Sequence, residues 1–251
     1  HVFAQNPALA NRGCAHEGPV ATRLGLAPIP VAAEVSAIRF WISLVEDTGA
    51  SIHFGRLSTA RGVAMVEAAQ RNGLRVSADV AAHQLFLTAD DVVGFNAMCH
   101  VLPPLRSAED RDALRDGVRR GVLGSICSDH QPHEADAKIN PFPLTEPGIS
   151  GLETLLPLGL QLVEDGVLSP LQLAARLSLG PARVLGVQVG RLSTGEPANL
   201  LLVDPAAHRE LRPESLLSAG RNTPFLGRLL PGRVRLTLHR GHAVYRADCE
   251  G

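Results

Sequence analysis

The sequence predicts an α/β fold in which short parallel strands alternate with helices. The prediction rests on the alternation of two kinds of segment along the chain. Segments with helical apolar spacing are separated by short strand-like runs, and strands joined through helices at this pitch pair in parallel with right-handed crossovers. A further observation concerns the C-terminal part, where strands follow one another without long helices from about Val187. This change predicts a small β appendage.

The first half of the chain begins with His1-Val2-Phe3-Ala4, a short apolar segment typical of the end of a strand. Residues 5–30 are expected to form a polar loop with two proline-linked turns. Residues 32–48 have the apolar spacing of a helix that ends at Gly49, and residues 51–56 are expected to form the next strand.

The following segments continue the alternation of helix and strand. Gly73 predicts the C-terminal cap of one helix, and Ser107 predicts the N-terminal cap of another. We expect a helix at residues 60–72 and a strand at 75–81. A second helix is expected at 108–120 and a second strand at 122–128, followed by a long polar loop at 129–149. We therefore predict four parallel strands, where a closed barrel of this class has eight.

The C-terminal part is expected to contain a helical bridge at residues 169–185 and then the β appendage. Its predicted strands are Asn199 to Asp204 and a pair that meets at the turn Arg240-Gly241. We expect residues 1–186 to belong to the barrel and residues 187–251 to the small β domain.

Composition excludes several classes of function. The chain has 24 basic and 25 acidic side chains and a formal net charge of −1, so nothing favours a nucleic-acid partner. No apolar run is long enough to cross a membrane. The cysteines are Cys14, Cys99, Cys127 and Cys249, without paired spacing, which favours a reducing cytoplasm over disulfides or a zinc–thiolate site. Because the first residue is His1, we expect the sequence to begin inside a longer chain.

Candidate chemistry gathers where the strands are expected to end, above all at Ser128-Asp129-His130-Gln131-Pro132-His133. Asp129 can hold a metal and orient water, and His133 can bind a substrate anion. The alternative interpretation is that Asp129 caps the loop and that His133 is a surface residue.

Several motifs in order give the chain a resemblance to the C-terminal half of a class I dihydroorotase of the amidohydrolase superfamily. These motifs are Glu17-Gly18-Pro19, Leu57-Ser58-Thr59, Pro103-Pro104-Leu105-Arg106, Asp129-His130-Gln131-Pro132-His133, Glu146-Pro147-Gly148-Ile149, Gly151-Leu152-Glu153-Thr154, Ala198-Asn199-Leu200-Leu201-Leu202-Val203-Asp204 and Asn222-Thr223-Pro224-Phe225. The resemblance implies a (β/α)8 TIM-type barrel, of which about the C-terminal four βα units are present, plus a small β appendage. It also implies the reversible, zinc-dependent cyclisation of carbamoyl-aspartate to dihydroorotate.

Carried over residue by residue, the resemblance indicates that the catalytic set is incomplete. Phe3 and Arg56 stand where the family has metal-ligating histidines, and Leu102 replaces an asparagine that contacts the substrate. Only Asp129, as a remnant base or metal-ligand position, and His133, as a remnant substrate contact, remain. A catalytic zinc needs about three protein ligands and an open position; phenylalanine has no lone pair and arginine repels the metal.

Neighbouring histidines are not expected to restore the site. His1 shares a strand face with Phe3 but lies lower, whereas His53 is three residues from Arg56 and is expected to face the other side. His83 matches a family Pro-His-His stretch outside the direct metal ligands, so we expect a structural role for it.

The pattern resembles the inactive pseudo-dihydroorotases that associate with aspartate transcarbamoylase in pyrimidine biosynthesis. It implies a noncatalytic scaffold subunit with no cofactor and the aspartate transcarbamoylase catalytic chain as partner. One alternative is an active zinc-dependent dihydroorotase, or a related cyclic amidohydrolase, with further ligands in an N-terminal half outside this sequence and Asp129 as base. Another is a module that binds a substrate-like anion through His133 and Arg56.

The predicted half-barrel would expose two parallel sheet edges, which isolated chains avoid. We therefore expect it to fold only against its own N-terminal half or a second chain.

Overall fold

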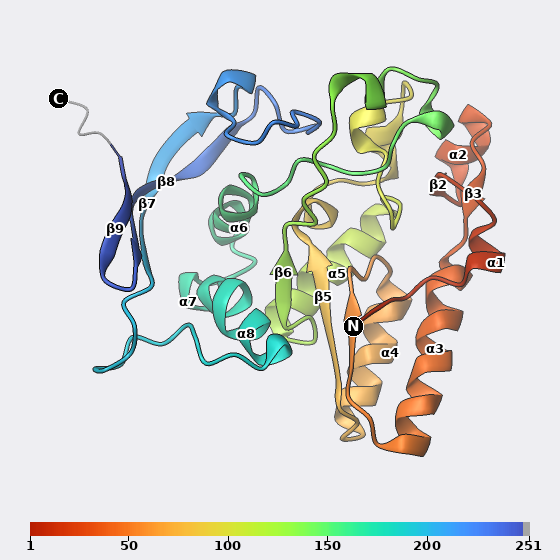
Figure 1. Cartoon of the computed structure of the whole chain (residues 1–251). Coiled ribbons are helices and arrows are strands. Elements are labelled where there is room, and N and C mark those ends of the chain that lie inside the picture. Colours follow the sequence, from red (N-terminus) through yellow and green to blue (C-terminus); the bar gives the residue numbers. More distant parts are fainter. Residues whose placement is uncertain (248–251) are drawn as a thin grey trace.

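A computed structural model describes residues 1–247 and contains two main sheets, as Figure 1 shows. The first has four parallel strands in the order β1-β4-β5-β6. The second has three antiparallel strands in the order β7-β8-β9. The parallel strands are β1 (Val2–Phe3), β4 (Ile52–Gly55), β5 (Val76–Ala81) and β6 (Ser125–Cys127).

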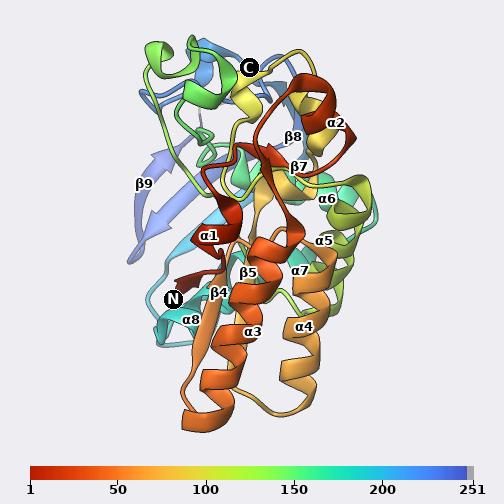
Figure 2. The same ribbon diagram turned by 90° about the vertical axis from the view of Figure 1, so that its right-hand side faces the viewer.

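Three amphipathic helices connect the parallel strands: α3 (Val31–Thr48), α4 (Ala60–Arg71) and α5 (Ala108–Arg120). In Figure 2 α3 and α4 lie side by side in front of the sheet. α5 begins with a capping box, in which Ser107 and Asp110 satisfy each other's backbone N–H groups, and it ends at left-handed Gly121. The predicted boundaries of these helices agree with the structure to within one residue.

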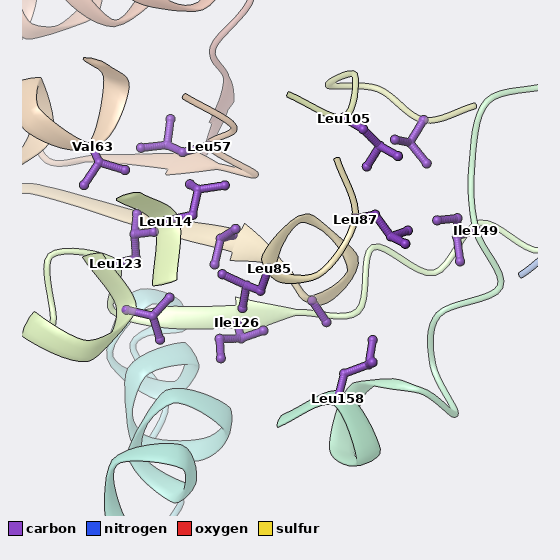
Figure 3. Packing of buried hydrophobic residues seen from close by; sticks show 14 of the residues in the cluster. Leu57, Val63, Leu85, Leu87, Leu105, Leu114, Leu123, Ile126, Ile149 and Leu158 are labelled. Atoms are coloured by element: carbon purple, nitrogen blue, oxygen red, sulfur yellow. The ribbon is translucent and has the colours of Figure 1, made fainter. Parts of the chain in front are cut away.

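The core lies between the helices and one face of the sheet. Along β5, Val76, Ala78 and Val80 face the helices, while Ser77 and Asp79 face the opposite side, as the two-residue period of a strand requires. Figure 3 shows buried leucines and valines from the helices and connecting loops, such as Val63 and Leu114, packed beside this sheet. On β5, the sheet face away from the helices therefore carries the polar side chains.

The segment at residues 5–30 is more ordered than the polar loop that we expected. Its two short helices, α1 (Pro7–Ala10) and α2 (Pro19–Leu24), both begin at a proline, which suits a position where no backbone N–H donor is needed. Between and after them, β2 (Ala15–His16) and β3 (Pro28–Ile29) pair in parallel. The proline starts explain why these short helices form, although the segment has no apolar periodicity that would have predicted them.

The C-terminal part follows the predicted order, with longer strands. α6 (Leu155–Glu164) packs against β8, and α7 (Pro170–Ala174) continues through a π-helical turn into α8 (Gly180–Leu185). The antiparallel strands are β7 (Leu200–Glu210), β8 (Leu229–His239) and β9 (His242–Arg246), and the last two meet at the predicted Arg240-Gly241 turn.

The segment around β6 differs from the prediction in two details. β6 is shorter than the strand expected at residues 122–128, and the loop at 129–149 contains two 3-10 turns, Ala135–Lys138 and Phe142–Leu144. No helix within residues 1–247 is long and apolar enough to cross a membrane. Cys249 lies outside the described residues.

Candidate functional site

The carboxyl ends of the four parallel strands bring the predicted site residues to one edge of the sheet. Phe3 ends β1, Arg56 follows β4 directly, and Asp129 lies two residues beyond β6. β5 contributes Asp79, and the 3-10 turn that follows it carries His83. In parallel α/β sheets this edge is where ligands and catalytic groups collect.

Arg56 is the central side chain of this edge. Its Nη1 atom donates to Asp129 Oδ1 at 2.8 Å, and its guanidinium carbon lies 4.6 Å from the centre of the Phe3 ring. Its backbone N–H donates to Asp79 Oδ1 at 2.6 Å. Arg56, which follows β4, therefore contacts residues associated with each of the other three parallel strands.

Asp79 links the Arg56 backbone to a polar row on the sheet. Its Oδ2 atom lies 2.9 Å from His53 Nε2, and His53 Nδ1 lies 2.8 Å from Ser77 Oγ. Cys127 Sγ donates to Asp79 Oδ1 at 3.6 Å. Burial, with the nearby charges of Asp79 and Asp129, raises the pKa of Cys127 well above its usual value, so this thiol stays protonated and is a poor nucleophile.

The expectation that His53 faces away from the site was wrong. His53 is buried and shares a sheet face with His1, because their ring centres lie 4.7 Å apart. The alternation rule failed at Arg56, which lies beyond the strand with a left-handed φ of 58°. His53 reaches the Arg56 backbone through Asp79, while His1 itself is exposed.

His83 is buried, with 2% of its surface exposed, and its Nε2 atom has no hydrogen-bond partner among the described residues. Burial lowers its pKa to about 4; the charge of Asp129 opposes this shift and that of Arg56 adds to it. The imidazole is therefore neutral at pH 7 and belongs to the electrostatic surroundings of the Arg56–Asp129 pair.

The loop after β6 holds the other residues of the predicted motif. Gln131 Nε2 donates to Asp129 Oδ1 at 2.9 Å. His133 donates from Nε2 to the carbonyl oxygen of Pro147 at 3.2 Å, and its backbone N–H donates to Asn222 Oδ1 at 2.8 Å. His133 is thus part of a loop network, and its Nε2 atom is already engaged.

Leu102 lies in an apolar environment. It packs against the small apolar cluster of Ala10, Ile29 and Ala33, next to the cis peptide bond between Leu102 and Pro103. In this chain Leu102 stabilises the segment around β3 and offers no polar group to a ligand.

Glu34 of α3 organises the loop that follows Arg56, and sequence reasoning missed it. Its Oε2 atom accepts from the backbone N–H and the hydroxyl of Ser58 at 2.9 and 2.6 Å, and Oε1 accepts from the same groups of Thr59 at 3.0 and 2.6 Å. Arg106 Nε donates to Ser58 Oγ at 3.1 Å. The Leu57-Ser58-Thr59 and Pro103-Pro104-Leu105-Arg106 motifs therefore meet, and the signal available in the sequence was an acidic residue on the apolar face of a helix.

By themselves, the described strand-end residues do not offer the three ligands of a catalytic zinc. Within residues 1–247 no three His, Cys, Asp or Glu side chains are arranged to hold a metal ion. Phe3 and Arg56, which the resemblance aligns with metal-ligating histidines, are an aromatic ring and a permanent cation, and that cation is bound to Asp129.

Comparison with known proteins agrees with the fold and with the motifs. The sequence model of the amidohydrolase family matches residues 14–244. A dihydroorotase-like protein of Pseudomonas aeruginosa is 52% identical over 242 residues, covering 96% of this chain and 57% of that protein. A dihydroorotase of Syntrophus aciditrophicus is 40% identical over 240 residues, covering 96% and 56%. The chain thus spans little more than half the length of these relatives.

Solved structures show the same architecture. An L-hydantoinase (dihydropyrimidinase) from Arthrobacter aurescens has a TM-score of 0.83 at 30% identity, over 88% of this chain and 50% of that one. An inactive dihydroorotase-like domain of a CAD-like multifunctional protein from Chaetomium thermophilum has a TM-score of 0.63 at 21% identity, over 84% and 55%, a likeness of fold alone. With a TIM-barrel-type α/β fold, dihydroorotase-like relatives and a family match over most of its length, this chain belongs to the amidohydrolase family.

Proposed function

We propose that this protein is a noncatalytic dihydroorotase-like subunit of pyrimidine biosynthesis and a scaffold for the aspartate transcarbamoylase catalytic chain. The observation that carries the proposal is the 2.8 Å contact between Arg56 Nη1 and Asp129 Oδ1. Under this proposal the guanidinium bonded to Asp129 takes the place of the cation and water that cyclic-amide hydrolysis would need. The 52% identity to a protein named dihydroorotase-like supports the same proposal.

Two measurements on the full-length protein test this function. Dihydroorotate hydrolysis should not exceed the rate of a blank, with or without added zinc. The protein should co-elute in size-exclusion chromatography with the aspartate transcarbamoylase catalytic chain of the same organism. Stoichiometric zinc with zinc-dependent turnover would contradict the noncatalytic part of the proposal, and separate elution of the two chains would contradict the scaffold part.

The second candidate is an active zinc-dependent dihydroorotase, or a related cyclic amidohydrolase, whose remaining metal ligands lie outside these residues. Retention of Asp129 and the 40% identity to a protein named dihydroorotase favour it. In that case Asp129→Ala in the full-length protein should abolish a measurable hydrolysis. The anion-binding alternative is less well supported, because His133 Nε2 already donates to Pro147.

We propose that residues 1–186 form the C-terminal four βα units of a barrel and that residues 187–251 form part of a small β domain. In the four-stranded sheet β1 pairs only with β4, and β6 pairs only with β5, so each has an unpaired edge among the described residues. Its own N-terminal half or a second chain would pair with these edges. Expression of residues 1–251 alone, compared with the full-length protein by circular dichroism, tests this partner.

A cytoplasmic location remains part of the proposal. The described cysteines, Cys14, Cys99 and Cys127, are free thiols, as expected in a reducing compartment.

A further inference from the structure

We infer that Arg56 is a built-in counter-charge of Asp129, and that this ion pair joins the carboxyl ends of the parallel strands in place of a metal ion. The inference rests on the proposed noncatalytic function and assigns a structural role to the same strand-end residues. It also gives a reason for the presence of Asp129 that does not involve catalysis.

Asp129 needs a positive partner because it is nearly buried. Its side chain is 8% exposed, and an ionised carboxylate in such a place is unfavourable unless it is paired. Its Oδ1 atom accepts from Arg56 Nη1 at 2.8 Å and from Gln131 Nε2 at 2.9 Å. The chain itself therefore supplies the charge-assisted hydrogen bond that this carboxylate requires.

Arg56 is held from several sides, so its charge is fixed in position. The Phe3 ring lies 4.6 Å below the guanidinium, a favourable cation–π arrangement. The backbone N–H of Arg56 is bound by Asp79. From the end of β4 the side chain reaches Asp129, two residues beyond β6, although β5 lies between these two strands in the sheet. One side chain thus connects both outer strands of the sheet.

The backbone at both partners agrees with this role. Arg56 and Asp129 have φ angles of 58° and 43°, in the left-handed region that residues with a Cβ atom rarely adopt. Such conformations persist where surrounding contacts determine them. The ion pair links the two residues that have this conformation at the strand ends.

A double-mutant cycle in the full-length protein tests the inference. Arg56→Gln and Asp129→Asn should each lower Tm by roughly 3 to 8 °C, because each leaves a charge without its partner. The double variant should lose no more than the larger single loss. If Arg56→Gln does not fold, Arg56→Lys, which keeps the charge and loses the planar stack on Phe3, replaces it and should give an intermediate Tm.

The pair formed by Arg235 and Asp204 provides a matched control. It has the same length of 2.8 Å, but its Asp204 side chain is 34% exposed where that of Asp129 is 8% exposed, so Arg235→Gln and Asp204→Asn should change Tm less and more nearly additively. Neither EDTA nor added zinc should change the Tm of the wild-type protein.

The inference would be overturned if the Tm losses of the Arg56 and Asp129 variants added up in the double variant, or if zinc raised the Tm of the wild-type protein. These outcomes differ from those that test the function. An additive cycle in a protein that has no turnover and binds the transcarbamoylase would overturn the counter-charge and leave the proposed function standing. Non-additive Tm losses in a protein that does not bind the transcarbamoylase would support the counter-charge and contradict the proposed scaffold function.

Discussion

Glu34 and Thr59 are joined twice across the interface between α3 and the start of α4: the carboxylate of Glu34 accepts the hydroxyl of Thr59 at 2.6 Å and its backbone N–H at 3.0 Å. Ser58 makes the equivalent pair of hydrogen bonds to the other carboxylate oxygen. A buried carboxylate thus satisfies four donors in the loop that positions Arg56.

Glu34→Gln should destabilise the protein by about 2 to 3 kcal/mol, because an amide has one acceptor oxygen and turns its NH2 group toward two donors. Urea unfolding followed by circular dichroism measures this loss. Glu46→Gln on the same helix is the control, since Glu46 is exposed and its variant should stay within about 0.5 kcal/mol of wild type. Equal stability of the two variants would contradict the role of Glu34.

Stability should fall as pH decreases from about 6.5 to 4, partly because of His83. Its folded pKa of about 4 lies below the ordinary value of 6.5, so the unfolded state binds more protons in this window and stability is lost on acidification. His83 accounts for a loss of up to about 3 kcal/mol in the free energy of unfolding over this pH range. His83→Phe should therefore show a smaller loss between these pH values in urea titrations.

His242→Phe is the control for the histidine experiment, because His242 is exposed on β9. It should keep the wild-type pH dependence. His100, buried with a pKa also lowered to about 4 chiefly by burial, accounts for part of the dependence that remains in His83→Phe. A pH profile of His83→Phe identical to wild type would contradict the lowered pKa of His83 in the folded state.

Cys99 should resist alkylation in the native protein. Burial raises its pKa to about 12, so on the order of one thiol in ten thousand is ionised at pH 8. Peptide mass analysis after iodoacetamide treatment should find Cys99 unmodified in buffer and modified in urea. Rapid labelling of Cys99 under native conditions would contradict its burial.

Asn222→Ala should loosen the loop at residues 129–149. The Asn222 side chain accepts from the backbone of His133 and donates to the carbonyl oxygens of Gln131 and Gly148. We expect a loss of about 2 to 3 kcal/mol and faster proteolysis within the loop. Asn199→Ala, which removes one exposed hydrogen bond to Arg240, is the control and should leave loop cleavage unchanged.

Much of the fold was predictable because its helices carry local signals. Ser107 before α5 and Gly49 after α3 mark helix ends by their own chemistry. The ordered segment at residues 5–30 was missed because short helices and two-residue strands have no periodicity to detect. The β6 boundary was missed because an apolar run does not show where pairing stops.

The candidate site was predictable in part. The positions of Phe3, Arg56 and Asp129 followed from motif order, which places them at the ends of parallel strands. The side on which His53 lies did not follow, because the left-handed residue at Arg56 interrupts the alternation of the strand. The role of Leu102 in a separate apolar cluster was likewise set by a long-range contact.

By itself the sequence determined an α/β chain with parallel strands and a β appendage, because residue types and their spacing are local properties; its resemblance to a family added the expectation that Phe3 and Arg56 stand at metal-ligand positions. Only the tertiary structure decided that Arg56 meets Asp129, that Glu34 binds Ser58 and Thr59, and that the buried His83 Nε2 atom has no hydrogen-bond partner among the described residues. These contacts join residues 24 to 73 positions apart, and their distances depend on how strands and helices pack.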